Sequence, residues 1–225
     1  MEIVPGIHQV DGVNGNCYII VHDSLTIIDT GVPGSGPKIL AYIRDQVHRD
    51  PAGIRTIILT HFHMDHTGGI VALKGAAPGA KLAVHEGDSP FVSGTSPLPR
   101  YRGVTGLILR FFEKIKPITI TPDILLNDGD IIDGLRCVHI PGHTPGSIGL
   151  LDEGSMVFFS GDILRFDGKS ISQGPAQFTM DPDRERESIR RIAGLGFGTM
   201  LAGHGMPLRP DASARVRDFA ATLPP

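Results

Sequence analysis

A histidine-rich motif directly follows an apolar run near residue 60 of this sequence. Thr56-Ile57-Ile58-Leu59-Thr60 is typical of a buried strand, and it leads at once into His61-Phe62-His63-Met64-Asp65-His66. In a chain with ten histidines in 225 residues, this arrangement arises by chance about once in a thousand such sequences. Clustered imidazoles repel one another once protonated and contribute little to an apolar core. The motif therefore predicts a chemical role.

The spacing within the motif favours metal binding. His61 and His63 lie two residues apart, so both rings can turn to one side, whereas the turn into Thr67-Gly68-Gly69 directs Asp65 and His66 to a second point. Neutral imidazoles and carboxylates are common ligands of zinc and other first-row metals. One segment can thus contribute ligands to two metal ions.

The rest of the chain alternates between groups of short strands and helices. Apolar runs predict strands at residues 17–21, 26–28, 56–60, 81–84, 124–126, 131–132, 135–140, 148–151, 156–159 and 199–202. Helices are predicted over 39–47, after residue 67, after an Asp181-Pro182 cap and after a capping Asp211. This order predicts an α/β fold in which two sheets pack together with helices outside. No linker divides the chain, so we expect residues 1–225 to form a single domain.

Composition excludes several classes of protein. Hydrophobic residues make up 40% and charged residues 20%, which excludes disorder. A net charge of -3 argues against nucleic acid as a partner. No apolar run is long enough to span a membrane, and the first residues lack a secretory pattern, so we expect a cytoplasmic location. Cys17 and Cys137 lie in apolar stretches and are expected to be buried free thiols.

The segment from residue 88 to residue 117 interrupts this pattern. Its prolines, beginning with Pro90, predict irregular structure, and Leu107–Phe112 then form a dense apolar block. We expect this insertion to be either a surface loop with a docked amphipathic helix, or a wall or lid of a substrate cleft. Arg100 and Arg102 within it would suit a substrate that carries an anionic group.

Five ordered elements of the sequence resemble the metallo-β-lactamase superfamily of binuclear metallohydrolases. They are Asp29 in Ile27–Gly31, the motif at 61–66, His143 in Pro141–Ser147, Asp162 after Ser160-Gly161, and His204 between two glycines. In that family the matching residues place His61, His63 and His143 on one metal ion and Asp65, His66 and His204 on the other, with Asp162 bridging both. The resemblance implies a four-layer αββα sandwich of two mixed sheets. It also implies two zinc ions, with iron or manganese as alternatives.

The resemblance further implies a catalytic mechanism. A hydroxide held between the two metal ions would attack a carbonyl carbon, with Asp65 orienting the hydroxide and Asp162 bridging the ions as the two catalytic carboxylates. Asp29 would lie outside the ligand set and fix the motif loop by hydrogen bonds. Arg165, three residues after the bridge, adds a second positive group for an anionic part of the substrate.

The family contains several activities, and the sequence favours one of them. It is similar to the hydroxyacylglutathione hydrolases and lactonases, which implies a small ester, thioester or lactone as substrate. A mononuclear iron persulfide dioxygenase using His61, His143 and Asp162 is an alternative, as are a phosphodiesterase or nuclease and a noncatalytic metal-binding module. His85 and His139 could each approach the metal cleft or simply pack in a strand. The sequence does not predict the oligomeric state.

Overall fold

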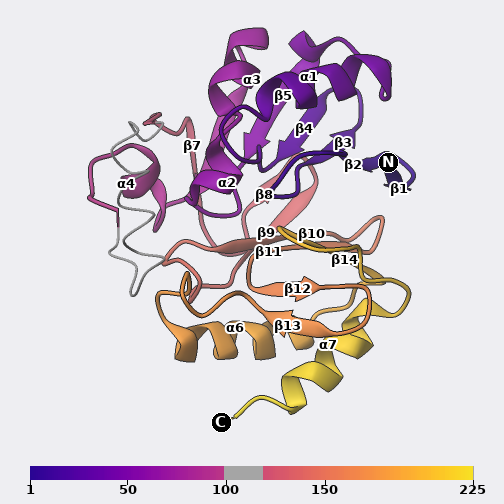
Figure 1. The fold of residues 1–225 in the computed structure, drawn as a ribbon, viewed down its shortest axis with the longest axis vertical. Coiled ribbons are helices and arrows are strands. Elements are labelled where there is room, and N and C mark those ends of the chain that lie inside the picture. The colour runs from indigo at the N-terminus through magenta and orange to yellow at the C-terminus, as the bar shows by residue number, and fades with distance from the viewer. Residues whose placement is uncertain (99–118, 225) are drawn as a thin grey trace.

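Two β-sheets stacked face to face form the centre of the computed structural model, which describes residues 1–98 and 119–224 (Figure 1). In these residues the first sheet holds seven strands in sequence order: β1 (Glu2–Val4), β2 (Ile7–Gln9), β3 (Tyr18–Val21), β4 (Leu25–Ile28), β5 (Ile54–Ile58), β6 (Lys81–His85) and β7 (Ile124–Leu126). The second sheet has the order β14 (Thr199–Ala202), β11 (Val157–Gly161), β10 (Ile148–Asp152), β9 (Leu135–His139) and β8 (Ile131–Ile132). A separate hairpin consists of β12 (Leu164–Phe166) and β13 (Ile171–Gln173).

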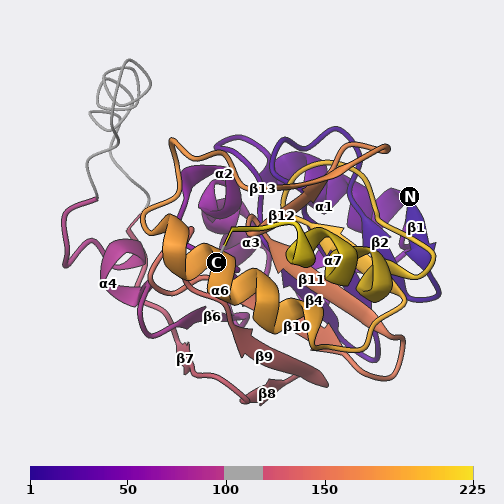
Figure 2. The same cartoon turned by 90° about the horizontal axis from the view of Figure 1, so that it is seen from below.

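Helices cover the outer face of each sheet. The first sheet is covered by α1 (Gly36–Asp45) and α3 (Ile70–Ala76), and the second by α6 (Pro182–Ala193) and α7 (Ala212–Ala221) (Figure 1, Figure 2). Shorter helices are α2 (Met64–Thr67), α4 (Ser89–Val92) and the 3₁₀ turn Pro51–Gly53. The expected four-layer αββα sandwich with two mixed sheets is confirmed. Among the helices that the structure describes, none is both long and apolar enough to cross a membrane.

The central strands are apolar on both faces because each sheet is covered on both sides. Ile57 in β5 packs into the core beneath α1 and α3, whereas its neighbour Ile58 packs between the two sheets. In β11, Phe158 packs against the residues of α6 and α7, and Phe159 packs between the sheets. A strand covered on both faces has a continuous apolar sequence. This double burial explains why the run before the histidine motif shows no polar alternation.

Four short strands were not predicted from the sequence. β1, β2, β12 and β13 have three residues each and contain half-buried or exposed polar residues such as Glu2, His8 and Ser172. A run this short cannot display a period. Pairing with a neighbouring strand in the folded chain therefore decides their conformation.

The expectation of irregular structure from residue 88 onward is wrong at its start. Ser89–Val92 form α4, with Pro90 in the first turn. Proline is favourable there because the first N–H groups of a helix have no partner within it. Residues 99–117, which include the apolar block at 107–112 and the two arginines of this segment, lie outside the described residues.

The helix caps and the cysteines test three local predictions. Asp181 caps α6 and its side chain accepts a hydrogen bond from the Arg184 N–H, as expected. Asp211 occupies the N-cap position of α7 as expected, but its backbone is left-handed, with φ of 58°, and its side chain forms no cap hydrogen bond. Cys17 and Cys137 are buried free thiols, as expected.

Strand direction brings distant chain segments to one edge of the sandwich. β4, β5 and β6 run parallel in the first sheet, and β9, β11 and β14 run in a common direction in the second. Asp29 follows β4, the histidine motif follows β5, and Asp162 follows β11. Binding residues of α/β sheets commonly lie beyond the carboxyl ends of strands. The expected site residues meet at this edge.

We predict that Phe159→Ala lowers the free energy of unfolding by about 3 to 5 kcal/mol, because it leaves a cavity between the sheets. The Phe159 ring is buried and packs edge-on against Tyr18 with 5.3 Å between ring centroids. Urea denaturation would measure the loss. Ile131→Ala is the control, since Ile131 is 74% exposed, and it should change stability by less than about 0.5 kcal/mol. Equal losses in the two variants would contradict this account of the core.

Candidate metal centre

The histidine motif is divided between a loop and a helix. After β5 the chain leaves the sheet as a short loop that bends at His61, and His63 then occupies the N-cap position of α2. Asp65 and His66 lie in this helix, and the His66 N–H donates to the His63 carbonyl. The helical turn therefore separates the two pairs of side chains, as the spacing predicted.

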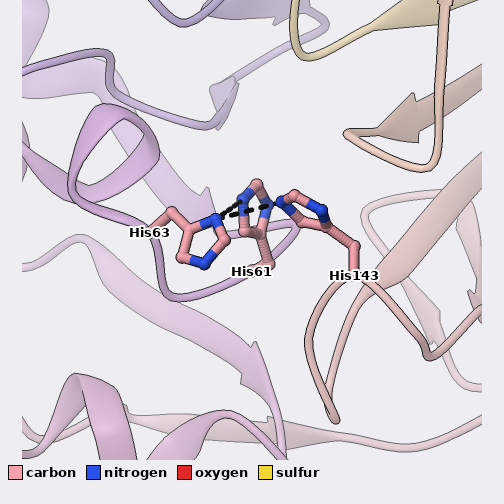
Figure 3. A group of neighbouring side chains, drawn as sticks. All are labelled: His61, His63 and His143. Carbon is pink, nitrogen blue, oxygen red and sulfur yellow. Dashed lines mark hydrogen bonds between the residues drawn. The ribbon is translucent and has the colours of Figure 1, made fainter. Parts of the chain in front are cut away.

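The first group of side chains consists of three buried histidines. His61 Nε2 and His143 Nε2 each lie 3.0 Å from His63 Nδ1 (Figure 3). His143 comes from the loop between β9 and β10. Two nitrogens bound to one zinc ion lie about 3.3 Å apart in tetrahedral geometry, so these separations are close to those of ligands that share an ion.

Burial keeps the imidazoles of this group neutral. It lowers the pKa of His63 to about 3 and that of His143 to about 4, and it holds the pKa of His61 well below the usual range. The neighbouring histidines act in the same direction on His61 because positive charges would repel. A neutral imidazole has the lone pair that a metal ligand needs.

The second group consists of Asp65, His66 and His204. His204 follows β14, and its Nε2 lies 3.0 Å from Asp65 Oδ2, while His66 Nε2 lies 3.9 Å from the same oxygen. Burial would raise the pKa of Asp65, but the hydrogen bond with His204 and the charge of His66 hold it well below its usual range. The carboxylate is therefore ionised at neutral pH.

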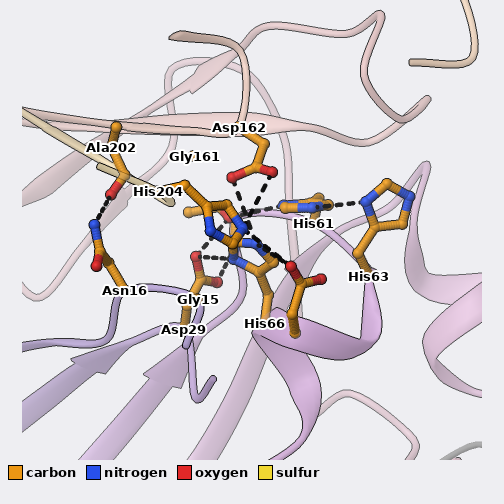
Figure 4. A network of polar contacts seen from close by, with 12 residues as sticks. Gly15, Asn16, Asp29, His61, His63, His66, Gly161, Asp162, Ala202 and His204 are labelled. Carbon is orange, nitrogen blue, oxygen red and sulfur yellow. Dashed lines mark hydrogen bonds and ion pairs between the residues drawn. The ribbon is translucent and has the colours of Figure 1, made fainter. Parts of the chain in front are cut away.

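Asp162 contacts both groups, and Figure 4 shows it beside His66 and His204. Its Oδ1 is 3.4 Å from His66 Nε2, and its Oδ2 is 3.7 Å from His143 Nε2 and 3.6 Å from His204 Nε2. Arg165, unexpectedly, donates from Nη2 to Asp162 Oδ2 at 2.8 Å. Burial would raise the pKa of Asp162, but these histidines and the guanidinium lower it. The structure thus brings all seven expected ligands into one cluster.

Two observations show that the cluster fits metal ions. His66 Nε2 and Asp162 Oδ1 are buried, and neither forms a hydrogen bond within the part of the chain that the structure describes. Burial lowers the pKa of His66, but the carboxylates of Asp29 and Asp162 outweigh it and raise that pKa to about 10. Negative surroundings at this point therefore favour a positive charge. Buried polar atoms without hydrogen bonds at ligand spacing are expected where an ion completes the site.

A glycine allows the second group to approach this closely. A Cβ atom built on Gly203 would lie 2.2 Å from Asp162 Oδ1 and 2.7 Å from His66 Cε1. Any side chain at position 203 would therefore enter the space between the carboxylate and the ring. This glycine immediately precedes His204 in the sequence.

Asp29 supports the motif from outside the ligand set, as expected. Its Oδ1 accepts from the Thr60 N–H at 2.8 Å, and its Oδ2 accepts from Thr60 Oγ1 at 2.7 Å and from His66 Nδ1 at 2.8 Å. Thr60 Oγ1 also lies 3.0 Å from His61 Nδ1. One buried carboxylate therefore orients two of the histidines, and it fixes the proton of His66 on Nδ1.

Sequence reasoning missed Asp88. This fully buried residue lies beyond β6, and its Oδ2 accepts from the Phe62 N–H at 3.0 Å and from Thr144 Oγ1 at 2.7 Å. Its Oδ1 accepts from the Gly146 N–H at 2.6 Å. Asp88 thus joins the loop of His61 and His63 to the loop of His143. Its only signal in the sequence is a position just after a predicted strand.

His85 and His139 belong to neither group of possible ligands among the described residues. Their rings stack on each other, with 4.0 Å between centroids and 14° between planes. His85 Nδ1 accepts from the Gly87 N–H at 3.0 Å, and His139 Nε2 lies 3.0 Å from the Pro145 carbonyl. These contacts favour packing of the loops as their role.

The fold and the cluster together define a class of sandwich proteins that hold a histidine and aspartate centre at the edge between two sheets. The family model of the metallo-beta-lactamase superfamily matches residues 10–204. The chain belongs to this superfamily.

Similar proteins agree with this assignment. The chain is 32% identical over 207 residues to "Acyl-coenzyme A thioesterase MBLAC2" of Bos taurus. The match covers 79% of this chain and 68% of that protein. It is 28% identical over 224 residues to "Hydroxyacylglutathione hydrolase" of Cereibacter sphaeroides. This match covers 95% of the present chain and 69% of that protein. The solved structure of "TTHA1623 in a di-iron-bound form" has a TM-score of 0.71 and 26% identity, and covers 95% of this chain and 98% of that one. The superfamily and its named members indicate a metal-dependent hydrolase.

We predict that Asp29→Asn weakens zinc binding by about 10 to 100-fold, the usual effect of changing a residue that orients a ligand. Asparagine keeps the size of aspartate and tolerates the left-handed backbone of this position, where φ is 58°. Its amide nitrogen would face His66 Nδ1, which then has to accept, so the ring proton moves to Nε2 and blocks ligation.

Competition with a chromogenic chelator would measure this zinc affinity. Asp23→Asn is the control, because Asp23 is exposed in the turn before β4. Unchanged affinity in Asp29→Asn would show that the hydrogen bond does not set the His66 tautomer.

Proposed function

We propose that this protein is a binuclear zinc-dependent hydrolase that cleaves a small thioester or ester. The observation that carries the proposal is the position of Asp162, whose two oxygens face His66 on one side and His143 on the other at 3.4 and 3.7 Å. A carboxylate between two sets of ligands is suited to hold two ions at a fixed separation and to offset their charge. We propose His61, His63 and His143 for one ion and Asp65, His66 and His204 for the other.

When bound, two zinc ions supply Lewis acidity toward a carbonyl oxygen and lower the pKa of a shared water. Asp65 is suited to orient that water, since its side chain is 36% exposed and lies at the open side of the cluster. Its ionised carboxylate can accept a hydrogen bond from the water and fix the direction of attack. His204 holds Asp65 in place through the 3.0 Å contact.

The substrate class is supported by the named relatives. One is named as an acyl-coenzyme A thioesterase and another as a hydroxyacylglutathione hydrolase, and both names denote thioester cleavage. A lactone has the same reacting carbonyl group. Arg165, which we expected to bind an anionic part of the substrate, contacts Asp162 instead. We therefore propose a small thioester as the first substrate to test.

The second group of side chains disfavours a dioxygenase, and the net charge of the chain disfavours a nuclease. A mononuclear iron dioxygenase would use His61, His143 and Asp162, which leaves Asp65, His66 and His204 without a role although they form a compact group. A nuclease requires a basic surface, whereas the chain has a net charge of -3.

We predict that the purified protein binds two zinc ions per chain and that its thioesterase activity depends on them. Dialysis against a chelator should abolish hydrolysis, and adding zinc should restore it. Elemental analysis together with assays of a thioester, a lactone, a bis-aryl phosphodiester and glutathione persulfide would test this. One iron per chain with oxygen consumption on persulfide would overturn the proposal in favour of the dioxygenase.

We predict that Asp162→Asn lowers turnover at least about 100-fold, because an amide has neither the charge nor the two equivalent oxygens of a bridging carboxylate. Metal content should fall below two ions per chain. Steady-state kinetics at saturating zinc would separate lost loading from lost chemistry. Asp183→Asn, an exposed position on α6, should behave like the wild type. Full activity in Asp162→Asn would mean that this carboxylate does not bridge the ions.

A further inference from the structure

The outward nitrogen of His143 contacts a threonine that in turn contacts a buried glutamate. His143 Nε2 faces the cluster, and its Nδ1 lies 3.4 Å from Thr179 Oγ1. Thr179 Oγ1 lies 3.1 Å from Glu185 Oε1 and 3.4 Å from the Pro175 carbonyl. A hydroxyl has one proton, and the shorter bond to a carboxylate is the stronger of the two. Thr179 therefore donates to Glu185 and is left to accept from His143 Nδ1.

Burying the Glu185 side chain costs free energy, and its contact with Thr179 explains why a glutamate lies there. It lies on α6 with 2% of its surface exposed, and burial raises its pKa to about 7. Within the described residues it forms no salt bridge, and its side-chain hydrogen bonds come from Thr179 and from Gln173 Nε2 at 3.3 Å. A buried carboxylate without a salt bridge is unfavourable. A metal ion held by His143 would supply a positive charge on the other side of the ring.

The backbone is shaped to allow the contact. A Cβ atom on Gly174 would lie 2.4 Å from the Asp162 carbonyl oxygen and 3.3 Å from both His143 Nδ1 and Glu185 Oε1. On the other side, a Cβ atom on Gly142 would lie 2.3 Å from the Glu185 backbone nitrogen. Gly142 therefore allows the start of α6 to approach the His143 loop, and Gly174 allows the segment after β13 to pass close to Asp162.

The same arrangement occurs on the opposite side of the cluster. His61 Nδ1 lies 3.0 Å from Thr60 Oγ1, which donates to Asp29 Oδ2 at 2.7 Å. In both cases a threonine hydroxyl stands between an imidazole and a buried carboxylate, and the imidazole directs Nε2 toward the other ligands. Two segments unrelated in sequence thus provide the same chain of donors and acceptors.

We propose that Thr179 and Glu185 are positioning residues that keep the proton of His143 on Nδ1 and so prepare Nε2 to bind a metal ion. This inference rests on the proposed metal centre. Hydrogen bonds to the outward nitrogen of a ligating histidine fix its tautomer and ring orientation, and losing one typically costs about 10 to 100-fold in metal affinity. Thr179 and Glu185 act through His143 and do not touch the substrate.

The test compares variants that keep or remove the hydroxyl. Thr179→Val keeps the shape of threonine and should weaken zinc binding by about 10 to 100-fold, as should Glu185→Gln. Thr179→Ser keeps the hydroxyl and should stay within about threefold of the wild type. Glu187→Gln is the matched control on the exposed face of α6 and should not change the affinity. The double variant Thr179→Val/Glu185→Gln should bind zinc no more weakly than the worse single variant, because both changes break one chain.

Two measurements are needed on each protein. Chelator competition gives the zinc affinity, and nitrogen NMR of the ion-free protein reports which ring nitrogen of His143 carries the proton. Equal affinities for Thr179→Val and Thr179→Ser, additive losses in the double variant, or an unchanged His143 tautomer would each overturn the positioning role. Wild-type protein that binds no zinc would overturn the proposed metal centre itself, and the positioning role with it.

Discussion

Five imidazoles and two carboxylates, most of them buried, form one cluster. Such a cluster is stable only if each ring directs a lone pair toward a donor or a metal ion, or a proton toward an acceptor. Burial keeps His61, His63 and His143 neutral, whereas carboxylates on two sides give His66 a raised pKa. Two metal ions would bind these imidazoles directly and so remove the need for the shifted pKa values, since the inward nitrogens and Asp162 already lie at about ligand spacing.

The sandwich provides the rigid frame for this cluster. The proposed ligands come from beyond β5, β9, β11 and β14, so both sheets contribute and the core between them sets their separation. Buried carboxylates then fix the loops that carry the ligands. Asp29 holds the histidine motif, Asp88 ties that motif to the His143 loop, and Glu185 approaches the same loop from the opposite side. Three buried carboxylates therefore stabilise the loops around the cluster.

Much of the architecture could be predicted because local patterns were strong. Continuous apolar strands, the Asp181 cap and the order of strands and helices were sufficient for two covered sheets, and all seven expected ligands fall in one cluster. The short strands β1, β2, β12 and β13 could not be predicted, because pairing rather than sequence pattern decides them. The prolines of the segment after residue 88 predict irregular structure, yet α4 forms there because proline is favourable in a first helical turn.

The residue types and spacing at 61–66 predict metal-binding chemistry before the fold is known. The orientation and charge of these side chains, in contrast, depend on contacts that form when the chain folds. Asp88, Thr179 and Glu185 lie far from the motif in the chain and have no pattern of their own, so their roles arise only when the loops meet. Likewise, Arg165 contacts Asp162 and not an open cleft because the β12–β13 hairpin places it there. Hydrogen bonds and pKa shifts depend on distances across the fold, which a linear sequence does not contain.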